Sequence, residues 1–306
     1  MVEVVSRDAE LASLHAFIGD VERGPAALVL EGEAGIGKST LWLAGIEAAR
    51  ARGFCVLSSR PAEAERDLAH AGLGDLFDDV LDGLLPALAP PRRRALEGAL
   101  LREEPSEELV DRRALAVAVR GLLQLLSERG PTLLAVDDVQ WLDSSSASAL
   151  LFALRRLEAS RVLLLVGRRS SADAPPSAIE QAFGPDRVRR VVLGPLSVGA
   201  VHKVLRDRLG TPFPRQTLLR IHERSGGNPF FALELARALD GDVDPLGELP
   251  VPATLDELVR VRISALPAAT REALALASAL GTASEAGSSG RGGSWARSAG
   301  ASAQRV

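Results

Sequence analysis

Hydrophobic and polar positions alternate over the first 195 residues in a way that predicts strands separated by helices. Short apolar runs typical of buried strands occur at five places, and amphipathic segments lie between most of them. The predicted strands cover residues 27–31, 54–58, 132–136, 162–167 and 188–193. Strands that alternate with helices over this length predict an α/β fold, in which helices cover both faces of a parallel sheet in three layers, α/β/α.

The predicted helices of this part cover residues 6–19, 39–52, 111–129 and 144–158, with a broken helical stretch over 61–105. Ser6 could cap the first of these helices and Asp143 the fourth. After residue 195 the pattern changes to helices alone, predicted at 197–209, 214–224, 229–239, 254–266 and from 268 to 280. We therefore expect an α/β domain over 1–195, a small all-helical subdomain over 196–280 and a disordered tail over 281–306.

Composition narrows the class of protein. The net charge of −4 gives no sign of a nucleic-acid or membrane partner, and the single cysteine excludes an internal disulfide. The amino terminus does not resemble a secretory signal, and the apolar runs are too short to span a bilayer. Four histidines and one cysteine show no metal-ligand spacing. We expect a cytoplasmic protein.

The strongest chemical signal follows the first predicted strand. Residues 32–39 read G-E-A-G-I-G-K-S, the phosphate-binding pattern G-x-x-x-x-G-K-[ST], and Lys38 is one of only two lysines among 36 basic residues. Glycines let backbone N–H groups converge on phosphate oxygens, the lysine reaches the β- and γ-phosphates, and the Ser39 hydroxyl can bind Mg²⁺. The alternative is an ordinary glycine-rich turn, but a strand before the loop and a helix after it favour a P-loop of an NTPase.

Acidic and basic residues end the next two central strands. Asp137 is expected to hold Mg²⁺ through water, and Asp138 to orient the attacking water. Solvated acids at a strand end are the alternative, which stays open for Asp138 because aspartate is shorter than the glutamate of many ATPases. An arginine at the end of the following strand could sense the γ-phosphate, and the sequence does not decide between Arg168 and Arg169. We assign Arg168 to the catalytic set with Lys38 and Asp138.

Four motifs carry a resemblance to a known family. They lie at residues 6–11 (S-R-D-A-E-L), 31–39, 136–143 (V-D-D-V-Q-W-L-D) and 225–231 (S-G-G-N-P-F-F), and residues 67–76 add a helical insert. Together they resemble the ATPase module of large ATP-binding LuxR-family regulators, which belong to the STAND class of signal-transduction ATPases and are related to AAA proteins. The resemblance covers about residues 1–280.

The resemblance implies a sheet in the order 5-1-4-3-2, with ATP or ADP and Mg²⁺ as ligands. It places Arg7 near the nucleotide, although Ser6 stands where the family signature has glycine. It also places Pro229 near the adenine, where a plain helix start with proline in its first turn is the alternative. The metal residues are then Ser39 and Asp137. The expected nucleotide-binding residues are Arg7, Gly32, Glu33, Ala34, Gly35, Ile36, Gly37, Lys38, Ser39, Thr40 and Pro229.

Three functions are compatible with these residues. The first is an ATP-binding switch with slow Mg²⁺-dependent hydrolysis, in which the nucleotide state repositions the helical subdomain. The second is an oligomeric remodelling ATPase, with Arg155 or Arg156 acting on a neighbouring protomer's nucleotide. The third is a truncated remnant that binds nucleotide without hydrolysing it, since the family's carboxy-terminal helix-turn-helix is not seen. The partner could be a second copy of this chain or a signalling protein, and the sequence does not decide between them. We expect neither direct DNA binding nor membrane contact.

Overall fold

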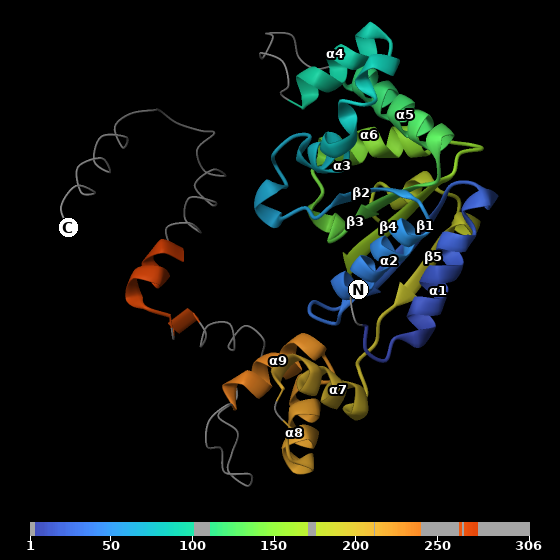
Figure 1. Cartoon of the computed structure of the whole chain (residues 1–306). Coiled ribbons are helices and arrows are strands. Elements are labelled where there is room, and N and C mark those ends of the chain that lie inside the picture. Colours follow the sequence, from blue (N-terminus) through green and yellow to red (C-terminus); the bar gives the residue numbers. More distant parts are fainter. Residues whose placement is uncertain are drawn as a thin grey trace, which may run out of the picture. The chain divides into compact units, whose positions relative to one another are not determined.

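The computed structural model describes residues 4–100, 111–170, 176–210, 212–239, 263–264 and 266–274. The chain divides into two compact units, Met1–Val251 and Pro252–Val306. The first unit contains the sheet and the helices labelled in Figure 1. In the second unit, residues 263–264 and 268–274 are helical. The predicted tail at 281–306 and most of the predicted helix at 254–266 lie outside the described residues.

Five parallel strands form one sheet in the order β2-β3-β4-β1-β5. This is the order 5-1-4-3-2 read from the opposite edge, so the fold class and the sheet order are both confirmed. The strands are β1 (Ala26–Gly32), β2 (Cys55–Ser59), β3 (Thr132–Val136), β4 (Val162–Arg169) and β5 (Val188–Val192). Each lies within two residues of its predicted bounds, and the central strands β1, β3 and β4 are runs rich in Val and Leu that are buried on both faces.

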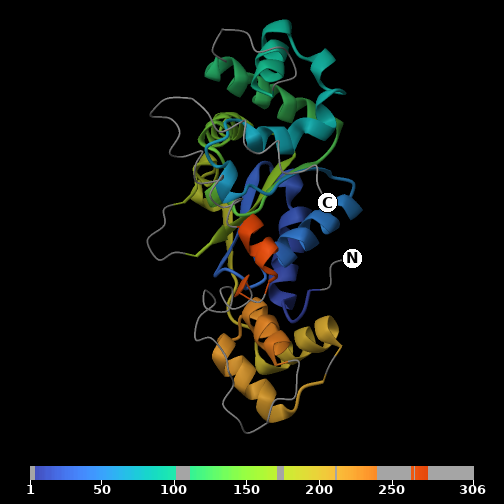
Figure 2. The ribbon, with the colours of Figure 1, turned by 90° about the vertical axis from the view of Figure 1, so that its left-hand side faces the viewer.

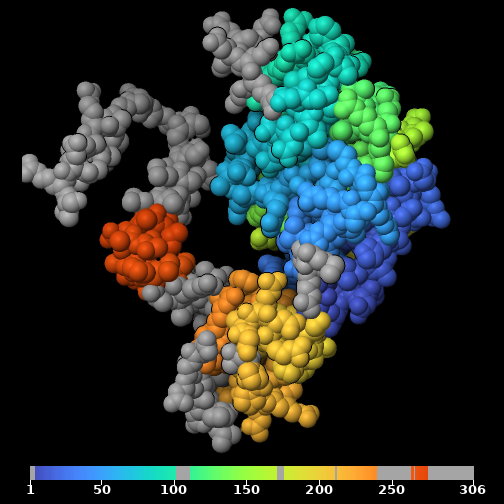
Figure 3. Space-filling model, in the orientation of Figure 1, coloured from blue at the N-terminus to red at the C-terminus, as the bar shows by residue number. Residues whose placement is uncertain are grey.

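Helices cover both faces of the sheet, as Figures 1 and 2 show. The helices α1 (Asp8–Gly19) and α2 (Lys38–Ala51) pack on one face, where their side chains form one continuous surface in Figure 3 (blue). The helices α3 (Ala71–Leu81), α5 (Arg112–Arg129) and α6 (Ser144–Leu154) pack on the other. Because successive strand residues point to opposite faces, Leu163 and Leu165 face α2 while Leu164 and Val166 face α6.

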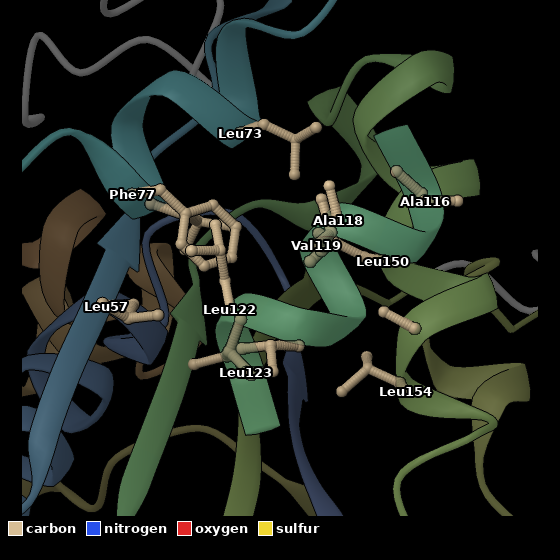
Figure 4. Close-up of a cluster of buried hydrophobic side chains, with 14 of the residues drawn as sticks. Leu57, Leu73, Phe77, Ala116, Ala118, Val119, Leu122, Leu123, Leu150 and Leu154 are labelled. Atoms are coloured by element: carbon tan, nitrogen blue, oxygen red, sulfur yellow. The ribbon is translucent and has the colours of Figure 1, made fainter. Parts of the chain in front are cut away.

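Large aliphatic and aromatic side chains fill the space between the sheet and the second helical layer. Figure 4 shows Phe77 of α3 close to Leu122 of α5, and Leu150 and Leu154 of α6 belong to the same cluster. Phe77 and Leu122 are fully buried, and each such side chain contributes about 2 kcal/mol by leaving water. This core holds α3, α5 and α6 against the sheet.

The stretch 61–105 was predicted to be helical but broken, and this is confirmed for residues 61–100, where α3 and α4 are separate helices. The helix α4 (Pro90–Ala99) begins at a proline, which lacks an N–H that the first helical turn does not need. The described residues also form six short 3₁₀ helices: η1 (Val21–Arg23), η2 (Glu63–Glu65), η3 (Leu85–Ala87), η4 (Val139–Trp141), η5 (Glu180–Ala182) and η6 (Pro185–Arg187).

One of the two predicted helix caps is confirmed. The Asp143 carboxylate accepts the N–H of Ser146 at 2.8 Å, and it also accepts those of His70 and Gly72 at the start of α3. It therefore joins the insert to α6. The cap predicted at Ser6 is wrong: the residue before α1 is Arg7, no side chain caps this helix, and Ser6 itself has φ 53°.

Three helices follow the sheet within the first unit. They are α7 (Val198–Leu209), α8 (Arg215–Ser225) and α9 (Pro229–Ala238), and they bury Val201, Ile221 and Leu235 against one another. We call α7–α9 the lid; its boundary with the α/β domain at residue 195 stays a prediction. No helix in the described ranges is both long and apolar enough to cross a bilayer.

Candidate functional site

The predicted P-loop leaves the carboxyl end of β1, where all five parallel strands end at the same edge of the sheet. Two of its glycines have backbone angles that favour glycine, with φ 78° at Gly35 and φ 105° at Gly37. Gly35 is required for a second reason, because a Cβ there would stand 2.8 Å from the Cβ of Phe230. The loop therefore turns tightly into α2, which begins at Lys38.

Lys38 lies inside this loop and is only 6% exposed. Its Nζ donates to the carbonyl oxygen of Gly32 at 3.0 Å and to that of Glu33 at 2.8 Å. Burial lowers the pKa of Lys38, while the nearby carboxylates of Asp138 and Asp137 act in the opposite direction. The structure thus brings together the loop lysine and the acidic pair of β3, as the strand ends predicted.

Asp137 follows β3 and is 2% exposed. Its Oδ1 accepts the N–H of Asp138 at 3.1 Å, and its Oδ2 lies 3.8 Å from a guanidinium nitrogen of Arg60 at the end of β2. Asp137 continues the series Leu133 and Ala135, which faces α2. Its carboxylate therefore lies on the same face of the sheet as the helix that follows the P-loop.

Asp138 has φ 46° and ψ 50°, a left-handed conformation that costs a non-glycine residue about 1 kcal/mol. Its Oδ1 accepts the amide of Gln140 at 2.6 Å and lies 3.6 Å from Nε of Arg169. Such local strain is common where a functional side chain must be held in a set direction. Gln140 was part of a recognised motif, but nothing in the sequence indicated this contact.

The two arginines that end β4 point to opposite faces of the sheet. Arg168 is buried on the α6 face, where it forms ion pairs with Glu31 at 3.0 Å and Glu180 at 3.6 Å. Arg169 lies on the P-loop face, with 51% of its side chain exposed, and approaches Asp138. The geometry thus favours Arg169 over Arg168 for contact with a phosphate, because the strand alternation directs only Arg169 toward the loop.

Arg7 lies against the P-loop and is 7% exposed. One guanidinium nitrogen donates to the carbonyl oxygen of Ile36 at 3.2 Å and to that of Gly194 at 2.7 Å, and another donates to Glu10 at 3.0 Å. Arg7 thus joins the loop to the segment that leaves β5. The resemblance placed Arg7 near the nucleotide, and the structure places it between the loop and this connection.

A cavity of about 840 Å³ lies over the P-loop. Ten of the predicted site residues line it: Arg7, Ala34, Gly35, Ile36, Gly37, Lys38, Ser39, Thr40, Asp138 and Pro229. Arg169 lines it too, whereas Gly32, Glu33, Asp137 and Arg168 do not. Its size is within the range of about 300–1,000 Å³ that is usual for small-molecule sites.

Sequence reasoning missed one side of the cavity. Apolar residues from the amino terminus, the connection after β5 and the lid line it, together with charged residues of α7 and α9. They are Val4, Val5, Leu196, Val204, Leu233, Asp207, Arg208 and Arg237. These residues are far apart in the sequence and carry no motif, so only the packing of the lid helices brings them together.

The residues at the sheet edge fit a nucleotide with its Mg²⁺. Within the described ranges, no three acidic, histidine or cysteine side chains form a cluster that would enclose a metal ion. Mg²⁺ bound to a nucleotide does not need one, since one or two protein ligands and the phosphate oxygens suffice. The Ser39 hydroxyl and the Asp137 carboxylate are oxygen donors of the required kind.

Comparison with known families gives one match. The sequence profile described as the AAA ATPase domain matches residues 3–166, more than half of the 306 residues. The match ends within β4 and so includes the P-loop and the acidic pair. No curated protein sequence matches the chain.

Similar solved structures include three proteins of low sequence identity. The ORC1 protein of Aeropyrum pernix in complex with DNA is 16% identical, with a TM-score of 0.47 over 88% of this chain and 70% of that one. The RuvB Holliday junction branch migration motor of Thermotoga maritima is 14% identical, with a TM-score of 0.44 over 77% and 62%. A STAND protein with a tetratricopeptide repeat sensor from Pyrococcus horikoshii is 15% identical, with a TM-score of 0.45 over 86% and 33%. The chain thus spans less than two thirds of the last two.

Proposed function

Because the chain belongs to the AAA ATPase domain family, we propose that it is an ATP-binding signal-transduction ATPase that hydrolyses ATP slowly with Mg²⁺. More narrowly, we propose that it is the nucleotide-dependent switch module of a LuxR-type regulator. The observation that carries the proposal is one cavity that three parts of the chain line together. They are the P-loop, the strand ends at Asp138 and Arg169, and Pro229 of the lid.

The phosphate end of the site is the P-loop. Lys38 is buried with its ammonium group held by two loop carbonyls, so little further ordering is needed before it binds a phosphate oxygen. Ser39 and Asp137 would hold Mg²⁺, which supplies charge neutralisation at the phosphate oxygens when bound. The apolar residues Val4, Leu196 and Leu233 line the same cavity and are suited to a nucleotide base.

Hydrolysis requires a group that orients water and a cation that stabilises negative charge in the transition state. Asp138 has the first role in this proposal: its carboxylate is fixed by Gln140 and accepts the proton of the attacking water. Arg169 has the second, because it lines the cavity beside Asp138 and stays half-exposed. The short aspartate side chain is consistent with a slow reaction.

The switch assignment rests on the lid. Helix α9 begins at the P-loop and also lines the cavity, so a change in nucleotide state acts on both. A regulatory switch needs differential binding of two nucleotide states, and ATP and ADP differ at the γ-phosphate that Lys38 and Arg169 would contact. The motifs described above support the LuxR-type assignment.

Single-turnover hydrolysis tests the enzymatic part. Native protein in excess over Mg²⁺-ATP is expected to convert the bound ATP to ADP, and Asp138→Ala is expected to bind ATP without cleaving it. If native protein and Asp138→Ala both leave ATP intact while binding it, the chain is a nucleotide-binding module without ATPase activity. A rate that rises steeply with protein concentration would instead indicate an oligomeric remodelling ATPase.

A further inference from the structure

Every backbone carbonyl of the P-loop from Gly32 to Ile36 accepts a hydrogen bond, either from Lys38 of the loop itself or from another part of the protein. Lys38 Nζ binds the first two. The lid binds the next two, because Asn228 Nδ2 donates to Ala34 at 2.8 Å and the N–H of Phe230 donates to Gly35 at 3.3 Å. Arg7 binds the last at 3.2 Å. The loop therefore has no free carbonyl in this stretch, and two of the five depend on the lid.

These bonds also fix the direction of the loop's N–H groups. In a trans peptide the C=O and the following N–H point in opposite directions, so a bond to the Ala34 carbonyl sets the direction of the Gly35 N–H. Within the described residues, no protein acceptor takes the N–H of Gly35 or of Gly37. Inward N–H groups bind phosphate, and an inward carbonyl would repel it.

The contact between lid and loop is close enough to transmit movement. A Cβ at Gly35 would stand 2.9 Å from the Asn228 side-chain oxygen and 2.8 Å from the Phe230 Cβ, so α9 begins directly on the loop. If the lid moves away, Ala34 and Gly35 lose both donors. Their peptide groups are then able to rotate, because Gly35 is at φ 78° and lacks a side chain.

We propose that Asn228 is a positioning residue that couples the lid to nucleotide affinity by holding the Ala34 peptide in the phosphate-binding orientation. The inference rests on the proposed function and extends it, since it names the residue through which lid position and phosphate binding affect each other. By linkage, bound nucleotide must then hold the lid on the loop to the same extent as the lid favours the nucleotide.

Asn228 has a second role that a test must separate. Its Oδ1 caps α9 by accepting the N–H groups of Phe230 and Phe231. Serine and aspartate cap helices about as well as asparagine, but neither offers the amide donor that reaches Ala34. Asn228→Ser and Asn228→Asp therefore keep the cap and remove the coupling contact. Ser197→Ala is the matched control, because it removes the cap of α7, a lid helix whose capping side chain bonds to Ala200 and, among the described residues, makes no hydrogen bond to the loop.

The experiment measures Mg²⁺-ATP and Mg²⁺-ADP affinity by calorimetry for the four proteins, and amide hydrogen exchange of residues 32–39 and 229–238. We expect Asn228→Ser and Asn228→Asp to bind both nucleotides roughly threefold to tenfold more weakly, the net worth of one hydrogen bond. We also expect faster exchange in the loop of both variants and an unchanged loop and affinity in Ser197→Ala. Affinities and loop exchange equal to native in both Asn228 variants would overturn the inference.

Failure of the inference and failure of the proposed function give different results. The exchange measurement without nucleotide tests the contact between lid and loop even if native protein binds no nucleotide. In that case the proposed function fails, and faster loop exchange in Asn228→Ser still shows that the lid orders the loop. Native-like loop exchange in both variants rejects the coupling, whatever the nucleotide affinities are.

Discussion

The backbone of Gly167 lies directly against the carboxylate of Asp137. A Cβ at Gly167 would stand 2.4 Å from Oδ1 of Asp137, well inside van der Waals contact. Asp137 directly follows β3 and Gly167 lies near the end of the neighbouring strand β4, both on the P-loop face of the sheet. The absence of a side chain in β4 thus sets the position of the carboxylate that we propose as the metal ligand.

Gly167→Ala is therefore expected to displace Asp137 and to slow Mg²⁺-dependent hydrolysis about a hundredfold, since small misplacements at a reacting centre have effects of this size. The measurement is the single-turnover rate over a range of Mg²⁺ concentrations. Gly184→Ala is the control, because a Cβ there meets no atom within 4 Å. Equal rates in Gly167→Ala and native protein would show that hydrolysis does not depend on the position of the Asp137 carboxylate.

The two arginines of β4 are expected to differ in what their removal affects. Arg168→Ala breaks ion pairs with Glu31 and the buried Glu180, and should lower the free energy of unfolding by about 3 kcal/mol. Arg169→Ala removes an exposed pair worth less than about 1 kcal/mol, but should slow hydrolysis. Denaturant unfolding and single-turnover rates on both variants check this. If instead Arg168→Ala slows hydrolysis and Arg169→Ala does not, Arg168 is the residue that contacts the phosphate.

The strain at Asp138 predicts two separable effects. Asparagine tolerates the left-handed conformation, so Asp138→Asn should fold with native stability and slow hydrolysis about a hundredfold by removing the proton acceptor. Asp138→Gly should lose activity as well but unfold at higher denaturant, with a gain of about 1 kcal/mol from relieved strain. Retained activity in Asp138→Asn would exclude a proton-accepting role.

His70 predicts a loss of stability in acid. Burial lowers the pKa of His70 below its ordinary 6.5, and Arg112 acts in the same direction while Asp143 opposes it. As pH falls through 6.5, the unfolded chain binds a proton before the folded chain does, so the free energy of unfolding decreases; above 6.5 this contribution is fully present. His70→Asn, which suits φ 67°, should lose less stability than native protein between about pH 7.5 and about pH 5. An identical pH dependence of unfolding in the two proteins would contradict this prediction.

Local patterns were enough to predict the strands and the position of the P-loop, whereas the order of the strands came from the family resemblance. The strand Thr132–Val136 is buried at every position and is followed by two aspartates, and a parallel sheet brings such strand ends to one edge. The alternation within β4 would also have separated Arg168 from Arg169, had the face covered by α2 been known. That face depends on long-range packing, which periodicity in a single segment does not contain.

The lid side of the site could not be predicted for the same reason. Asn228 and Ala34 are 194 residues apart, and their hydrogen bond depends on how α9 docks on the loop. The Ser6 cap failed because Arg7 is held by Ile36 and Gly194, and these contacts set the direction of the chain before α1. Tertiary contacts outweigh a capping preference of about 1 kcal/mol.

The central claim is that the cavity over the P-loop binds a nucleotide through Lys38. Its most direct test is calorimetric titration of ATP and ADP into native protein and into Lys38→Ala. We predict saturable binding of both nucleotides to native protein and binding to Lys38→Ala that is weaker by about a hundredfold or more, since a buried charged contact to phosphate is lost. Equal affinities in the two proteins, or no binding to native protein, would contradict the account.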